Sequence, residues 1–161
     1  IHPWKLAALE DRAVRAGASC IRTQPLTSPD DLARRAGTAD RLLIDAPCTG
    51  LGVLRRHPDT KWKLTPAEVD RLVRLQHDIL DAHTPMLKPG GTLVYSTCTI
   101  SRRENSDLVA RVAAEAGLEI DDLGALAPDL ADPHDSRFIQ LMPDRDRTTG
   151  FFISRMVKGR G

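Results

Sequence analysis

Two short apolar runs, separated by one long helical pattern, constrain the fold of this chain more than any other feature. The runs are RLLID, residues 41–45, and TLVYST, residues 92–97. Apolar runs of this length, without regular alternation of polar residues, are typical of strands in a sheet whose two faces are both covered. The sequence therefore predicts two buried parallel strands in an α/β fold, joined by a crossover helix.

Helix signals surround these two runs. The longest pattern follows Thr65, which precedes Pro66 and has Glu68 three positions later, a capping box with proline in the first turn. Apolar residues then recur at helical spacing up to Leu87. Similar start and stop signals predict three further helices, over residues 3–16, from residues 28–31 to residue 37, and from residues 101–104 to residue 117.

The remaining segments complete a predicted sheet. Residues 18–22 form a short strand candidate, and residues 121–135 form an expected surface loop. Residues 138–142 and 151–157 are two further strand candidates, and their short connection predicts that they pair antiparallel. We expect an α/β fold with a mostly parallel sheet that ends in an antiparallel pair of strands.

Composition limits the possible partners and the compartment. The 161 residues are enough for one domain. The net charge is close to zero, with 23 Lys and Arg against 22 Asp and Glu, so any basic surface must be confined to part of the molecule. No stretch is apolar enough to span a bilayer, and no signal-peptide pattern is present. The three cysteines are an odd number without C-x-x-C spacing, which argues against a disulfide scaffold and for a reducing compartment. We expect a cytoplasmic protein without a membrane partner.

Two cysteines occupy similar places in the pattern. Cys48 comes just after the first apolar run and Cys98 just after the second. Ligands of open α/β sheets bind beyond the carboxyl ends of the strands, so both thiols should open into one crevice. Thiol chemistry is favoured over simple core packing for this pair, whereas Cys20 is interpreted as a small core hydrophobe. A metal site is a weaker alternative, because no histidine has the spacing of a paired ligand.

A basic loop lies between the two strands. The segment LRRHPDTKWK, residues 54–63, gathers several cations around Trp62. Cations bind phosphates and aromatic rings stack on bases, so the loop is a candidate RNA-binding segment, although a solvated basic loop is the plain alternative. Gly50 and Gly52 follow a strand, but no third glycine and no acidic partner complete a dinucleotide-binding motif, which favours a tight turn.

Three stretches resemble the S-adenosylmethionine-dependent RNA 5-methylcytosine methyltransferases of the Sun/Fmu (RsmB) family. They are DAPCTGLGVLRRHPDTKW, LQHDILDAHTPMLKPGGTLVYSTCTISRREN and the terminal GFFISRMVK. The resemblance implies the C-terminal part of a Rossmann-like class I methyltransferase fold, with residues 1–161 as the C-terminal portion of a catalytic domain. The glycine-rich cofactor loop of the family is then expected upstream of residue 1.

The resemblance also implies roles for single residues. Cys98 would be the nucleophile that adds to C6 of cytosine, Cys48 would assist release of the methylated product, and Asp45 would contact S-adenosylmethionine. The substrate would be RNA, with ribosomal RNA as the expected class. The residues expected to bind it are Pro47, Arg55, Arg56, His57, Lys61 and Trp62. No metal is expected.

Other functions stay open from the sequence. A DNA cytosine methyltransferase would attack with the Pro-Cys thiol, and Cys98 in a Thr-Cys context argues against it. A non-catalytic RNA-binding module that retains the fold is the alternative from another class, although retention of both cysteines disfavours it. We also expect residues 1–161 alone to be inactive.

Overall fold

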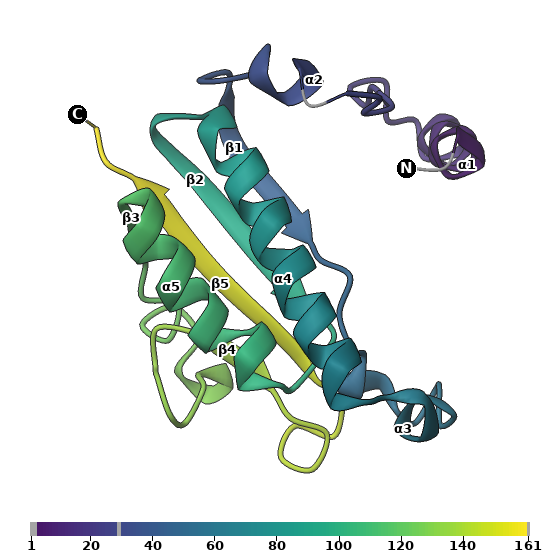
Figure 1. Cartoon of the computed structure of the whole chain (residues 1–161), viewed down its shortest axis with the longest axis vertical. Helices are drawn as coiled ribbons and strands as arrows, with labels where there is room; N and C mark the ends of the chain where they lie inside the picture. The colour runs from purple at the N-terminus through teal and green to yellow at the C-terminus, as the bar shows by residue number, and fades with distance from the viewer. Residues whose placement is uncertain (1–2, 29, 161) are drawn as a thin grey trace. The chain divides into compact units, whose positions relative to one another are not determined.

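The computed structural model describes residues 3–28 and 30–160, which belong to two compact units, residues 1–35 and 36–161. The first unit contains helix α1 (Pro3–Arg15) and, after a segment without regular structure, the short helix α2 (Asp30–Ala33) (Figure 1). Helix α1 ends close to Gly17, whose φ of 65° lies in the left-handed region that favours glycine. The predicted helix over 3–16 is thus confirmed.

Three predictions for the segment between residues 18 and 37 are wrong. Residues 18–22 form no strand, because a strand is stabilised by hydrogen bonds to a neighbouring strand, and these residues pair with none of the described segments. Cys20 is exposed and is therefore not a core hydrophobe. The helix expected up to Gly37 is also shorter, since α2 ends at Ala33 and turns follow it.

The second unit is built on one mixed sheet of five strands in the described part of the chain. They are β1 (Ala39–Asp45), β2 (Leu87–Thr97), β3 (Leu118–Ile120), β4 (Ile139–Leu141) and β5 (Phe151–Lys158). The order is β1-β2-β5-β3, with β4 also paired to β5. Strands β1 and β2 are parallel, and β5 is antiparallel to β2, β3 and β4. All strands except β5 therefore run in one direction, which confirms the mostly parallel sheet with an antiparallel terminal pair.

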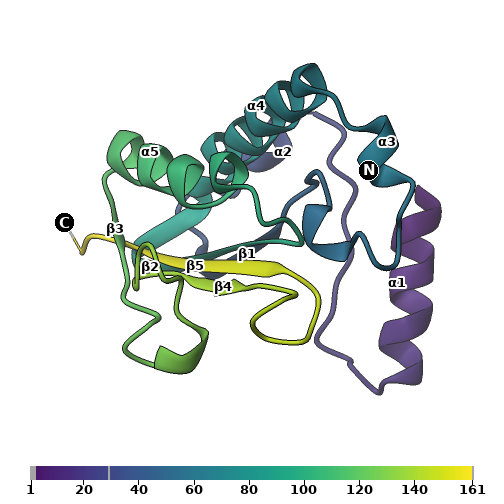
Figure 2. The ribbon, with the colours of Figure 1, turned by 90° about the horizontal axis from the view of Figure 1, so that it is seen from below.

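The helices of this unit lie mainly on one face of the sheet. Helices α4 (Pro66–His83) and α5 (Ser106–Ala116) cover the same face, and α3 (Thr60–Lys63) precedes α4 (Figure 2). Helix α4 begins as predicted, because the Thr65 side chain accepts a hydrogen bond from the Glu68 N–H. Short 3-10 helices occur at Leu51–Val53, Thr84–Met86, Arg102–Glu104 and Pro128–Leu130.

The core lies between the sheet and the two long helices. Strand β2 supplies its centre, since Leu93 and Tyr95 have no exposed surface, and the Phe152 ring packs edge-on against Tyr95 with centroids 6.4 Å apart. The other buried apolar residues of this core are Ile44, Ala46, Leu80, Leu87, Leu108, Val109, Val112, Ala113, Leu118, Phe138 and Met156. This packing makes β2 a rigid central strand with Cys98 just beyond its end.

Strand β1 departs from its prediction. The run RLLID was expected to be buried, yet only Ile44 of it is buried, and the Leu43 side chain is 69% exposed. The reason is topological: β1 lies at one end of the described strand order and pairs with β2 alone. The predicted loop over 121–135 is confirmed in outline, although Leu123 and Asp132 in it are buried. In the described residues no helix has the length and apolar character needed to cross a membrane.

Candidate active site

The two cysteines lie side by side beyond the ends of β1 and β2. The strands pair with Asp45 opposite Ser96, so their carboxyl ends are level. Cys48 follows β1 and Cys98 follows β2, and their Sγ atoms are 3.4 Å apart. Both thiols are free and partly buried. The strand pairing expected from the sequence thus brings together the two residues that the sequence singled out.

A buried carboxylate holds the segment that carries Cys48. Glu104 has no exposed surface, and its Oε1 accepts the Thr49 N–H at 2.9 Å while its Oε2 accepts the Thr49 hydroxyl at 2.6 Å. The Thr99 hydroxyl lies 3.2 Å from Oε2, and the Gln76 amide donates to Oε1 at 3.0 Å. Glu104 therefore links the residue after Cys48 to the residue after Cys98.

The neighbouring residues extend this polar network. Asn105 accepts from the Thr97 hydroxyl at 2.6 Å, and its amide donates to the Thr99 carbonyl at 3.1 Å. The Gln76 amide also donates to the Pro47 carbonyl at 2.8 Å, which ties helix α4 to the residue before Cys48. Buried hydrogen-bond networks rigidify their surroundings, so both cysteine-bearing segments are held on two sides. One atom of this network, the buried Gln76 Oε1, has no hydrogen-bond partner among the described residues.

No local pattern in the sequence indicates this role of Glu104. Ser101–Glu104 was interpreted as a capping box, but the Ser101 side chain makes no capping bond, and residues 102–104 form a 3-10 helix before Asn105 interrupts the path to α5. The predicted single helix from residues 101–104 to Gly117 is therefore wrong at its start. The Glu104 carboxylate points into the site because Thr49 and Gln76 offer it buried donors.

The environment of the Cys48 thiol disfavours its ionised form. Burial, and then the hydrogen bond with Cys98, raise the pKa of the Cys48 thiol to about 12. Cys48 is therefore protonated at neutral pH and has an S–H to donate. Burial likewise raises the pKa of the Tyr95 hydroxyl far above its usual range, and this hydroxyl donates to the Glu104 carbonyl at 2.9 Å.

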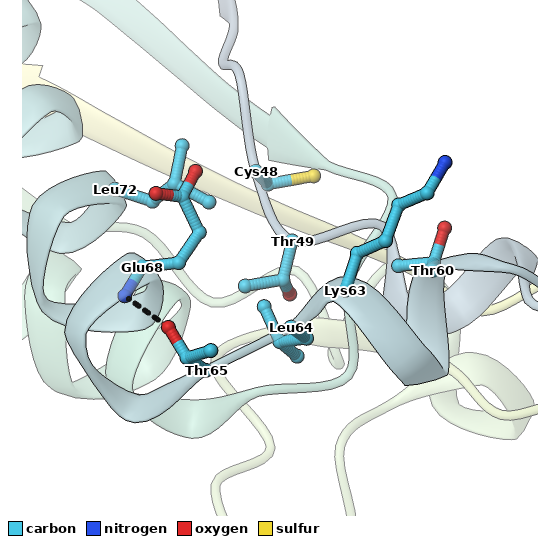
Figure 3. Close-up of a pocket in the computed structure, with 8 residues that line it drawn as sticks. All are labelled: Cys48, Thr49, Thr60, Lys63, Leu64, Thr65, Glu68 and Leu72. Carbon is cyan, nitrogen blue, oxygen red and sulfur yellow. Dashed lines mark hydrogen bonds between the residues drawn. The ribbon is translucent and has the colours of Figure 1, made fainter.

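A cavity of about 400 Å³ opens beside Cys48. Helix α3, helix α4 and the segment after β1 supply its lining, which consists of Cys48, Thr49, Thr60, Lys63, Leu64, Thr65, Glu68 and Leu72 (Figure 3). Figure 3 shows the Cys48 sulfur and the Lys63 side chain on the same side of this cavity. Leu64 and Leu72 are its apolar lining residues, and the other side chains carry thiol, hydroxyl, ammonium and carboxylate groups.

The other predicted site residues lie at the surface around the cysteine pair. Asp45 is exposed and accepts one hydrogen bond, from the Ser96 hydroxyl at 3.2 Å. Pro47 is exposed, and so is the basic loop, in which the Lys61 ammonium lies 4.8 Å from the centre of the Trp62 ring. The predicted loop residues with exposed side chains are Arg55, Arg56, His57, Lys61 and Trp62.

The histidines that were weighed as metal ligands have other contacts. His77 contacts Glu115 at 2.7 Å, His83 contacts the Ile79 carbonyl at 2.7 Å, and His57 is exposed. Within residues 3–28 and 30–160, no group of three His, Cys, Asp or Glu side chains has the geometry to hold a metal ion.

The comparison with known families identifies the chain. Residues 1–157 match the model of the family described as 16S rRNA methyltransferase RsmB/F. The chain belongs to this family. Members use S-adenosylmethionine as the methyl donor, and a Rossmann-like methyltransferase fold agrees with the strand order found here.

Individual relatives agree with the family. The chain is 38% identical over 168 residues to the probable ribosomal RNA small subunit methyltransferase B of Bacillus subtilis (strain 168), which covers 98% of this chain and 36% of that protein. The crystal structure of NSun6 from Pyrococcus horikoshii with SFG is similar with a TM-score of 0.82 and 28% identity, covering 98% of this chain and 39% of that one. The crystal structure of PH0851 is similar with a TM-score of 0.87 and 26% identity, over 98% of this chain and 35% of that one. The chain thus spans about a third of the length of these relatives.

Proposed function

We propose that this chain is the C-terminal portion of the catalytic domain of an S-adenosylmethionine-dependent methyltransferase that modifies C5 of cytosine in ribosomal RNA through a covalent cysteine adduct. The observation that carries the proposal is the 3.4 Å approach of the Cys48 and Cys98 sulfurs at the ends of adjacent parallel strands. Family membership and the rRNA methyltransferase names of the relatives support the substrate class.

In the proposed reaction the Cys98 thiolate is the nucleophile. It forms a bond to C6 of cytosine, and the electron pair of the C5–C6 double bond makes C5 nucleophilic. S-adenosylmethionine, when bound, supplies an electrophilic sulfonium methyl group to C5. Loss of the C5 proton to a base then restores the double bond as the C6–S bond breaks and Cys98 leaves as a thiolate.

Cys48 assists the two steps in which Cys98 carries negative charge. Because its raised pKa keeps Cys48 protonated, its S–H can donate to the Cys98 sulfur across 3.4 Å. A hydrogen bond to an anionic sulfur stabilises the thiolate before attack and again when it leaves C6. The second thiol therefore favours release of the product without forming a bond to the base.

Asp45 fits a cofactor contact. Its exposed carboxylate accepts only the Ser96 hydroxyl among the contacts found, which leaves acceptor positions for a hydroxyl or amine of S-adenosylmethionine. One such bond contributes about 1 kcal/mol, whereas micromolar affinity needs about 8 kcal/mol. We therefore propose that residues 1–161 alone bind the cofactor too weakly to methylate RNA. Calorimetry that detects tight binding to this chain would contradict this.

The experiment that tests the mechanism is a denaturing gel of the full-length enzyme with substrate RNA and cofactor. Cys98→Ala should form no covalent protein–RNA complex, because the nucleophile is lost. Cys48→Ala should accumulate the complex, because attack still occurs while elimination is impaired. The reverse pattern would exchange the roles of the two thiols, as in a DNA-type mechanism. No complex with either variant would favour a non-catalytic RNA-binding module.

A further inference from the structure

A hollow lined by three arginines lies away from the cavity beside Cys48. Its volume is about 390 Å³, and its lining is Arg55, Arg56, Arg147, Thr148 and Thr149. Among the described residues, none of these three guanidinium groups forms an ion pair or a side-chain hydrogen bond. Six other arginines of this unit have acidic partners, whereas four are also without an ion pair in the described residues but do not line this hollow. The paired ones are Arg71, Arg102, Arg103, Arg137, Arg145 and Arg155, and the unpaired ones are Arg41, Arg74, Arg111 and Arg160. The hollow therefore concentrates positive charge that the protein leaves uncompensated.

The two segments that form this hollow come from distant parts of the sequence. Arg55 and Arg56 follow the 3-10 helix Leu51–Val53, while Arg147 belongs to the loop between β4 and β5. Arg147 has a φ of 53°, a left-handed conformation that residues with a side chain seldom adopt. Its side chain is thus presented from a tightly turned backbone next to two threonine hydroxyls.

Backbone contacts connect the hollow to the reactive cysteine. The Gly150 N–H donates to the Gly52 carbonyl at 2.8 Å, and the Gly52 N–H donates to the Cys98 carbonyl at 3.0 Å. The approach is so close that a Cβ at Gly52 would lie 2.3 Å from the Gly150 carbonyl oxygen and 2.8 Å from that of Cys98. The β4–β5 loop is therefore fixed relative to Cys98 through two consecutive hydrogen bonds.

We propose that this hollow binds backbone phosphate of the RNA strand that carries the target cytosine. The inference rests on the proposed function and adds the β4–β5 loop to the substrate-binding surface. Guanidinium groups bind phosphate oxygens with paired N–H donors, and threonine hydroxyls add further donors. Because the loop is fixed relative to Cys98, a phosphate bound here sets the position of the strand along the site. Base chemistry at Cys98 and strand positioning at Arg147 are then separate tasks.

The test uses the full-length enzyme and the fluorescence anisotropy of a labelled single-stranded RNA that contains one cytosine. Arg147→Gly is the informative variant, since glycine suits the left-handed backbone and should leave thermal stability equal or higher. Arg111→Ala is the control, because Arg111 is an exposed arginine of α5 that also forms none of the ion pairs found.

Loss of one phosphate contact on single-stranded RNA should make the slope of log K against log[salt] shallower by about 0.7. The ratio of wild-type to variant affinity should therefore grow about fivefold when the salt concentration falls from about 1 M to about 0.1 M. We expect this change for Arg147→Gly and none for Arg111→Ala. Replacing the phosphate beside the cytosine with an uncharged methylphosphonate should remove the difference between wild type and Arg147→Gly.

Equal affinity and salt slope for wild type and Arg147→Gly would overturn the inference. If the affinity difference between wild type and Arg147→Gly persists wherever the methylphosphonate is placed, Arg147 makes no direct contact with a phosphate. Either result can be distinguished from failure of the proposed function, because the covalent protein–RNA complex of Cys48→Ala is measured separately on the same enzyme.

Discussion

Removal of the Glu104 carboxylate should destabilise the protein through the segment that carries Cys48. In Glu104→Ala the Thr49 N–H loses its acceptor, and the Gln76 amide keeps only the Pro47 carbonyl. The Thr49 and Thr99 hydroxyls remain 2.8 Å apart and can still bond to each other. The main penalties are therefore one orphaned buried backbone donor and the space left by the missing side chain.

The magnitude follows from these contacts. An unsatisfied buried donor costs about 1–3 kcal/mol, and lost packing around the removed atoms adds to this cost. We expect Glu104→Ala to lower the free energy of unfolding by about 2–4 kcal/mol. Glu104→Gln should cost only about 1 kcal/mol, because its oxygen can accept from Thr49 and Gln76 while its amide donates to a threonine hydroxyl.

Urea unfolding of the full-length protein, followed by circular dichroism, measures these differences. With a typical urea m-value of about 2 kcal/mol/M, the expected loss for Glu104→Ala moves the midpoint by about 1–2 M. Glu119→Ala on the exposed side of β3 is the matched control and should stay within about 0.5 kcal/mol of wild type. Equal free energies of unfolding for Glu104→Ala and Glu119→Ala would refute the structural role of Glu104. Equal losses of unfolding free energy for Glu104→Ala and Glu104→Gln would refute the role of its hydrogen bonds.

Three further outcomes follow from the same structure. The rate at which iodoacetamide alkylates Cys48, measured on its peptide by mass spectrometry, should stay low at pH 9 and rise only toward pH 12, because the thiolate is the reactive form and the pKa of Cys48 is raised to about 12. Exposed Cys20 should react first. Equal alkylation rates of Cys48 and Cys20 at pH 9 would contradict this prediction. Gly52→Ala should cost about 1–3 kcal/mol or displace Gly150, because its Cβ would lie 2.3 Å from the Gly150 carbonyl oxygen; a thermal melt identical to wild type would argue against that contact. Thr65→Ala should cost about 1 kcal/mol by thermal melt while Thr65→Ser retains stability, because the hydroxyl caps α4; equal losses would exclude a capping role.

The elements that sequence patterns predicted well are those whose signals are local. Helix α4 begins at its capping threonine and proline, and β2 is the apolar run 92–97 extended toward Leu87. The approach of Cys48 and Cys98 was also predictable, because two strands joined by one long helix are neighbours and parallel strands end at the same edge. These inferences needed only periodicity and a rule of topology.

The failures all depend on contacts between distant segments. An apolar run does not show how many neighbours its strand has, so the exposed edge position of β1 was missed. Among the described residues, no strand pairs with residues 18–22. Glu104 matched a capping box locally, yet its donors are on Thr49 and Gln76. The grouping of Arg147 with Arg55 likewise depends on the close approach of Gly52 and Gly150, which no local pattern encodes.

The two cysteines occupy equivalent places in the sequence pattern but not in the folded chain, and the difference bears on the roles that we propose for them, attack by Cys98 and assistance by Cys48. Cys48 is followed by Thr49, whose N–H and hydroxyl both bind the Glu104 carboxylate, so its segment is held inward and burial keeps its proton in place. The segment of Cys98 is held as well, at the Cys98 carbonyl by the Gly52 N–H and at Thr97 and Thr99 by Asn105. The buried network thus holds the backbone beside both cysteines, and the raised pKa of the Cys48 thiol is the observation that favours Cys48 as the hydrogen-bond donor in the proposed reaction, with Cys98 as the attacking residue.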